Sequence, residues 1–201
     1  MSQGIEFVVN DEAALEMMRA LELTESDHVA INARIAARAQ ALTQKHLQEI
    51  ALSRHTTAEE LGADPTKFWE TAADNTTGAS DEQQATITVR HPGIGRALHD
   101  VTIFPTEGRS YLTIPVAARA YGVRAAELGR EIPLFPITTR GVSFLATRPP
   151  GQKIAVAMYL LTPSAFLRQD RTLLPSDEAF MAAAAAGIRD WVKLQLEGGA
   201  V

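Results

Sequence analysis

The stretch that decides the fold is residues 27–54, which read DHVAINARIAARAQALTQKHLQEIALSR. It contains no Gly or Pro and is rich in Ala, the residue that favours an α-helix most. One helical stripe is formed by positions three or four residues apart, namely Ile31, Ile35, Ala39, Leu42, His46 and Ile50. The helix would be roughly 40 Å long at 1.5 Å per residue. A small domain rarely covers such a length, so we expect one end or one face of the helix to meet another element or subunit.

The residues before this helix suggest an appended element. Residues 4–9 alternate weakly and predict a short strand. Asp11 can cap a short acidic helix that reaches about Leu21, and TESD then offers a cap for the long helix at Ser26 or Asp27. We therefore divide the chain into residues 1–26, an arm or interface element, and residues 27–201, a single α+β domain.

Two short helices and a loop are expected after the long helix. Residues 56–74, TTAEELGADPTKFWETAAD, predict a helix that ends at Gly62 and a second that Pro65 opens. Residues 74–84 are polar, and we expect a mobile loop there.

From Thr86 the hydrophobic period changes from that of a helix to that of strands. Strand-like segments follow at residues 85–91 and 101–105, and residues 107–129 predict a strand, a proline and then a small-residue helix. Residues 133–161 predict strands that TRG and RPPG turns separate. Pro175–Ser176–Asp177–Glu178 then opens a closing C-terminal helix that Gly198–Gly199 stops. Helices, a mostly antiparallel sheet of about four to five strands and one closing helix predict the α+β class.

The closing helix contains a tract with almost no side chain, Ala182–Ala186 followed by Gly187. Such a tract lets another backbone approach closely. We expect it to pack on the sheet, and a contact between subunits is the alternative.

Composition excludes several classes of protein. The chain of 201 residues has no Cys, which excludes disulfides, thiolate catalysis and cysteine-ligated metals. No run of about 18 apolar residues is present, so we expect no membrane-spanning helix. The net charge of −5 hides an asymmetry: residues 1–82 carry a net charge of −9, and residues 83–171 carry +6. The two sectors can attract each other within one chain or across neighbouring subunits.

Residue types that carry chemistry do not form a recognisable site. His46 and Glu49 could face one metal, but the second His of a zinc-protease helix is missing. His91 and His99 flank a Gly/Pro-rich segment, and the remaining histidines are at 28 and 55. Gly93-x-Gly95 lacks the third glycine of a dinucleotide site, and a tight turn explains it better. We expect a structural or exposed role for each His, no catalytic residue, no metal and no cofactor.

A basic stretch interleaved with tyrosines is the candidate interaction surface. Arg and Tyr are enriched where proteins bind proteins, although such a mixture could also touch a DNA backbone. The acidic net charge favours a protein partner. The candidate interface residues are Arg90, Arg96, Arg109, Tyr111, Arg119, Tyr121 and Arg124.

Three ordered segments resemble a known family. They are RHTTAEELGADPTKFWETAA, ITVRHPGIGRALHDVTIFPTEGRSYLTIPVAARAYGVRAAELG and TLLPSDEAFMAAAAAGIRDWV, within roughly residues 30–195. Together they are similar to the virion-morphogenesis proteins of tailed phages and prophages, the Mu-like group of tail-completion or neck proteins. Residues 1–26 have no counterpart in that pattern.

The resemblance implies a structural role without catalysis. It implies a homo-oligomeric ring, commonly sixfold, at the head–tail junction or tail top of a virion, assembled in the host cytoplasm. Head-closure or connector proteins and tail terminator or tail tube proteins would be its neighbours, with packaged DNA in the channel. The alternatives are a tail terminator ring, a channel protein whose Arg90, Arg96 and Arg109 contact DNA, a tail-assembly chaperone absent from the finished particle, and a hydrolase that uses His91 or His99.

Overall fold

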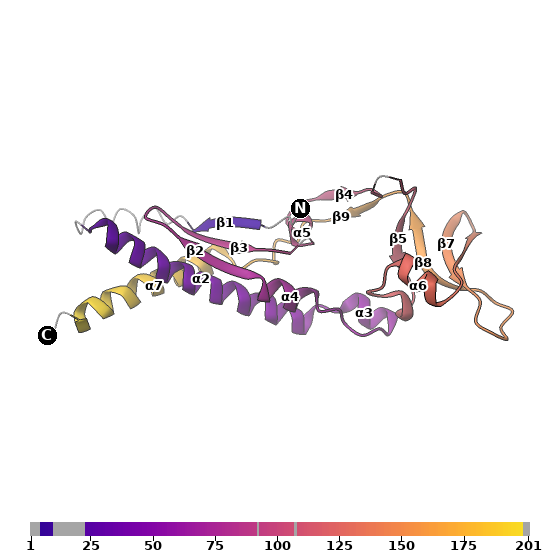
Figure 1. Ribbon diagram of the computed structural model, residues 1–201, viewed down its shortest axis with the longest axis horizontal. Helices are drawn as coiled ribbons and strands as arrows, with labels where there is room; N and C mark the ends of the chain where they lie inside the picture. The colour runs from indigo at the N-terminus through magenta and orange to yellow at the C-terminus, as the bar shows by residue number, and fades with distance from the viewer. Residues whose placement is uncertain (1–4, 10–22, 92, 107, 199–201) are drawn as a thin grey trace. The chain divides into compact units, whose positions relative to one another are not determined.

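The computed structural model describes residues 5–9, 23–91, 93–106 and 108–198, and it confirms an α+β fold (Figure 1). The helices are α2 (Glu25–Ser53), α3 (Thr56–Leu61), α4 (Phe68–Asp74), α5 (Ile94–Ala97), the 3₁₀ helix η1 (Ala118–Ala120), α6 (Ala125–Glu131) and α7 (Asp177–Gly198). The strands are β1 (Ile5–Val9), β2 (Thr76–Ser80), β3 (Ala85–Val89), β4 (Val101–Ile103), β5 (Leu112–Pro115), β6 (Phe135–Thr139), β7 (Val142–Thr147), β8 (Val156–Thr162) and β9 (Ala165–Leu167). The expected acidic helix from Asp11 lies outside the described residues. In the described part of the chain, every helix is too short or too polar to cross a bilayer.

The chain forms two compact units, where the sequence predicted one domain over residues 27–201. Unit 1 comprises Met1–Ser53, Phe68–His99 and Gln169–Val201, and unit 2 comprises Arg54–Lys67 and Asp100–Arg168. The difference has a physical basis, because the units bury separate cores. Unit 1 holds two apolar clusters, which include Ile35 and Leu47, and unit 2 holds a third around Tyr159.

The long helix that the sequence predicted is confirmed as α2, the centre of unit 1, although its buried stripe differs in part. Ile31, Ile35, Ala39 and Ile50 are buried, but Thr43 and Leu47 take the places expected for Leu42 and His46, which are half-buried. The helix begins two residues earlier than expected. Thr24 caps it, because the backbone N–H of Asp27 donates to Thr24 Oγ1 (3.3 Å) and Asp27 Oδ2 accepts from the N–H of Thr24 (3.0 Å).

Helix α7 packs mainly on α2 and touches the sheet of β1, β3 and β2 only slightly, whereas the sequence predicted that it packs on the sheet. An added Cβ at Gly187 would lie 2.9 Å from the backbone nitrogen of Ile35 and 3.0 Å from the carbonyl carbon of Arg34. The tract from Ala182 to Gly187 therefore lets a second backbone approach, as expected, but that backbone is a helix. The predicted cap is confirmed, since Ser176 Oγ accepts from the N–H of Ala179 (3.3 Å).

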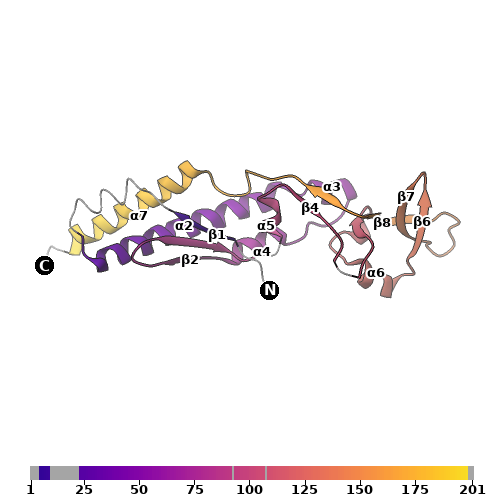
Figure 2. The same cartoon turned by 90° about the horizontal axis from the view of Figure 1, so that it is seen from above.

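Residues 76–80 form strand β2, so the prediction of a mobile loop over residues 74–84 was wrong there. Antiparallel pairing gives the three-stranded sheet A the order β1-β3-β2, which leaves β2 at an edge. Figure 2 shows β2 and α7 on different sides of α2. Three amide side chains of α2 hold β2 and the turn after it: Asn32 donates to the carbonyl of Asp81 (2.9 Å), Gln40 accepts from the N–H of Gly78 (2.8 Å), and Gln44 donates to the carbonyl of Thr76 (3.3 Å). We call these three residues the amide ladder.

Unit 2 contains two sheets instead of the single sheet expected for the whole chain. Sheet B is the ribbon β4-β9, and sheet C has the order β5-β8-β7-β6, all antiparallel. The register between β7 and β8 shifts at Leu145/Ala146 and leaves Met158 without a partner. This bulge turns both Met158 and Tyr159 towards Ala120 of η1 and Leu128 of α6, with which they form the core of unit 2.

Smaller differences concern where elements begin. Helix α4 starts at Phe68, three residues after Pro65, and the expected small-residue helix is divided into η1 and α6. Strand β9 was not expected. Gly62 ends α3 in the left-handed conformation (φ 64°), as predicted.

Candidate functional site

The seven candidate interface residues are divided between the two units. Arg90 and Arg96 belong to unit 1, and the other five belong to unit 2. All are exposed except Tyr121, which is half-buried. The sequence therefore grouped residues that belong to two different units.

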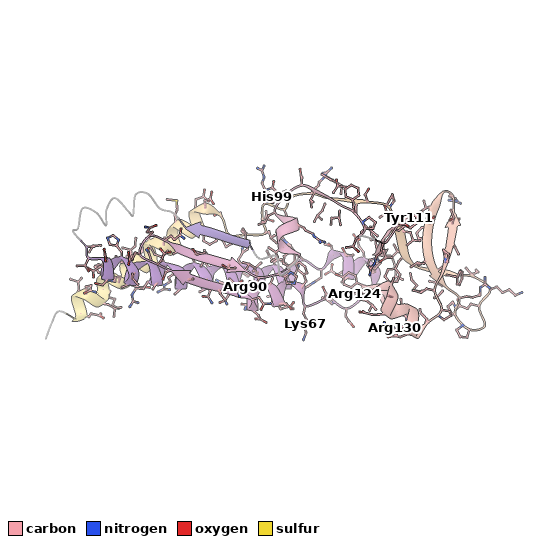
Figure 3. All side chains as sticks on the ribbon, turned by 45° about the horizontal axis from the view of Figure 1, so that its top comes forward. Lys67, Arg90, His99, Tyr111, Arg124 and Arg130 are labelled. Carbon is pink, nitrogen blue, oxygen red and sulfur yellow. The ribbon has the colours of Figure 1, made fainter. Side chains whose placement is uncertain are left out.

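Within unit 2, two of the candidate arginines already take part in local structure. The Arg119 guanidinium of η1 lies 3.8 Å from the carboxylate of Glu131 at the end of α6. The backbone N–H of Arg124 donates to Glu127 Oε2 (3.4 Å), which caps the start of α6. Figure 3 shows Arg124 and Arg130 by α6, away from Tyr111 at the start of β5.

The histidines occupy separate structural positions. His46 Nε2 lies 3.0 Å from the carbonyl oxygen of Thr172, and the ring of His91 packs edge-on against Phe68 with centroids 4.2 Å apart. Burial lowers the pKa of His91 below its ordinary value, and its Nδ1 accepts from the N–H of Gly93 (3.3 Å). His99 is exposed. Among the described residues, no three His, Asp or Glu side chains gather as metal ligands.

Gly93 leaves room for the ring of Phe68. Its φ of −91° is available to any residue. An added Cβ would lie 2.6 Å from Cε2 of Phe68, so a side chain at this position would displace the ring. The glycine therefore packs α5 against α4, a different reason from the tight turn that the sequence suggested.

Sheet C carries an apolar surface that the sequence analysis missed. Register places Ile114, Leu160, Phe144 and Ile137 side by side across β5, β8, β7 and β6. We call these four residues the apolar row. Neighbouring residues of a strand point to opposite faces, so Leu160 faces away from the core side chain Tyr159. Ile114 is 36% exposed and the other three are half-buried, so the row remains accessible to solvent.

Two further apolar surfaces are exposed. At sheet B, Phe166 of β9 is 62% exposed, and Phe104, the residue directly after β4, is 66% exposed. On α7, Met181, Val192 and Leu196 are exposed on one side of the helix, and Leu196 is 74% exposed.

The sequence contains part of the information that predicts the apolar row. The segment VAMYLL, residues 156–161, is apolar at successive positions, which is typical of a strand whose two faces are both apolar. Cross-strand register, which places Leu160 beside Phe144 and Ile114, cannot be read from one segment.

No family model, curated protein or solved structure matches the chain.

Proposed function

We propose that the chain is a structural subunit of a tailed-phage or phage-like particle, and that it forms a ring where the head joins the tail. The observation that carries the proposal is the amount of large apolar surface that the folded units leave accessible. Phe166 in β9 and Phe104 directly after β4 are about two-thirds exposed, at a ribbon of only two strands. Such ribbons are marginally stable in water on their own. Exposed aromatic groups of this kind mark surfaces that bind other proteins.

The division of charge between the units supports contacts between subunits. Unit 1 contains nine basic and seventeen acidic residues, a net charge of −8, and unit 2 contains ten basic and seven acidic residues, a net charge of +3. Ring closure requires one surface to meet a different surface of the next subunit, and opposite net charges favour that pairing over contacts between like units. The resemblance of residues 30–195 to neck and tail-completion proteins supplies the location in the particle.

Electron microscopy of particles produced without this protein tests the proposal. We expect filled heads and complete tails that are not joined. Tails of irregular length would instead assign the chain to a terminator ring, and normal particles would refute a structural role.

A charge-reversal experiment tests the pairing of unlike units. Arg124→Glu combined with Arg130→Glu changes two exposed side chains of unit 2, and we expect weaker assembly with unchanged folding. Arg119 is unsuitable, because its reversal would also repel Glu131. Assembly equal to that of the wild type in light scattering would contradict the electrostatic contribution.

A further inference from the structure

Each of the two units carries an apolar surface that its fold leaves accessible to solvent. On unit 2 it is the apolar row of sheet C. On unit 1 it is a stripe of α7 that contains Met181, Ala185, Ile188, Val192 and Leu196, which we call the outer stripe. Its members are four, three, four and four residues apart, the spacing of one helical face.

The outer stripe lies on a different side of α7 from the contact with α2. At 3.6 residues per turn, Val192 is rotated by about 140° from Gly187, the residue that touches Ile35. Met181, Val192 and Leu196 are exposed, whereas Ile188, at the margin of the stripe, also packs against the core. In the part of the chain that the structure describes, α7 thus has one apolar face that packs on α2 and a second that keeps exposed apolar side chains.

Sheet C is suited to contact through its face and poorly suited to contact through its edges. Its outer strands, β5 and β6, contain Pro115 and Pro136. A proline at an edge removes a hydrogen-bond donor that an added strand would need. The apolar row crosses all four strands, so a helix laid on this face can contact each of them.

Charge indicates which partner fits the row. Residues 135–162, which form β6, β7, β8 and their connections, contain Arg140, Arg148 and Lys153 and no acidic residue, and all three are exposed. The Arg148 guanidinium carbon lies 5.8 Å from the centroid of the Phe135 ring. An apolar partner within an acidic unit matches this surface, and unit 1 has a net charge of −8.

We propose that the outer stripe of one copy packs on the apolar row of a second copy. The inference rests on the proposed function, because it names the contact from which the ring is built. Two different surfaces on one chain make the contact heterologous, and repetition of such a contact closes a ring when the rotation permits. The acidic first turn of α7, Asp177 and Glu178, would bring negative charge next to the basic margin of sheet C.

A mixing experiment with the full chain tests this contact. The row variant is Phe144→Thr with Ile137→Thr, since Thr is accepted in strands. The stripe variant is Val192→Gln with Leu196→Gln, since Gln is accepted in helices. Leu52→Gln is the control, because it removes an exposed apolar group of α2 outside both surfaces. Circular dichroism of each variant checks that the fold is retained.

Sedimentation equilibrium over a concentration series gives the result. We expect wild type and Leu52→Gln to associate, and each double variant to associate at least about tenfold more weakly. An equimolar mixture of the two variants should recover association but stop at pairs, because it retains one intact row and one intact stripe. The proposal is overturned if the mixture shows no recovery, if the stripe variant associates like wild type, or if wild type shows no concentration dependence up to millimolar chain.

A chemical cross-link provides a second measurement that is independent of affinity. The chain has no cysteine, so Ile114→Cys and Leu196→Cys each introduce a single thiol. A short bismaleimide should join the two different variants faster than it joins either variant to itself. Faster joining of Ile114→Cys to itself would indicate that two sheets face each other and would overturn the proposal. These experiments could find no contact between the outer stripe and the apolar row while particles that lack the protein still show unjoined heads and tails. In that case the proposed contact is wrong and the proposed function stands.

Discussion

Replacing Gly187 by Ala should destabilise unit 1, although Ala is the better helix former. In a helix interior the propensity difference alone would stabilise the variant by about 1 kcal/mol. The new Cβ, however, would meet backbone atoms of α2 at 2.9–3.0 Å, and backbone cannot rotate away as a side chain can. Overpacking of this kind costs about 2 kcal/mol, so we expect a net loss of about 1 kcal/mol. Gly187→Val should lose more.

Urea denaturation followed by tryptophan fluorescence measures this loss in the correct unit, because both tryptophans, Trp69 and Trp191, lie in unit 1. Ala182→Gly is the matched control. It lies in α7 with an exposed side chain, so it should report the helix-propensity term alone, a loss of about 1 kcal/mol. If Gly187→Ala gains what Ala182→Gly loses, the close approach of α7 to α2 does not exist and the reasoning fails.

Three further predictions concern contacts of unit 1. Gln40→Leu should speed hydrogen exchange of the Gly78 amide and destabilise unit 1 by about 1 kcal/mol, because that N–H loses its acceptor; unchanged exchange would contradict the role of the amide ladder. His91 has a lowered pKa in the folded state, so the unfolded state binds a proton at this residue more readily. The free energy of unfolding should therefore fall as the pH drops below about 6.5. The urea midpoint of His91→Gln should lack this part of the pH dependence. Arg38→Ala should cost less than about 1 kcal/mol, because its ion pair with Asp190 (2.6 Å) is largely exposed, and a larger loss in the same urea assay would show that the pair is better shielded than its exposure indicates.

Controls for these predictions come from the same elements. Gln48→Leu changes an exposed amide of α2 that is not part of the amide ladder, and it should leave Gly78 exchange unchanged. For the pH experiment, His99→Gln is the matched control variant, because it removes an exposed imidazole.

Elements whose stability depends on nearby residues could be predicted from the sequence. The long helix, the end of α3 at Gly62 and the cap at Ser176 all follow from residues within one turn of each other. The α+β class follows from the change of hydrophobic period near Thr86. These predictions succeed because helix caps and amphipathic spacing are local properties.

Strand β2 could not be predicted because, although it pairs with the next strand β3, the α2 side chains that hold it are far away in the sequence. TTGAS is polar and contains Gly, so it resembles a loop. Gln40 lies 38 residues before Gly78, and Asn32 lies 49 residues before Asp81. The division into two units has the same origin, because the chain returns to unit 1 only after residue 168.

The candidate interface was predicted from residue type alone, which does not show what contacts each residue already makes in the folded chain. The interface assignment of the seven residues stays a prediction, but composition cannot show that Arg119 already pairs with Glu131. Composition also gives no weight to Leu160, which looks like an ordinary core residue until register places it on the accessible face of sheet C.

Unit 1 is formed by three separate stretches of the chain, and this affects the order in which the two units fold during synthesis. A ribosome completes unit 2 at residue 168, while α7, the last described element, is still to be made. Until α7 emerges, the side of α2 that contains Ile31 and Ile35 lacks its contacts with Ala184 and Trp191 of α7. Unit 1, which contains the N-terminus, is therefore completed after unit 2. A nascent chain truncated before residue 177 should contain a folded unit 2 and an incomplete unit 1.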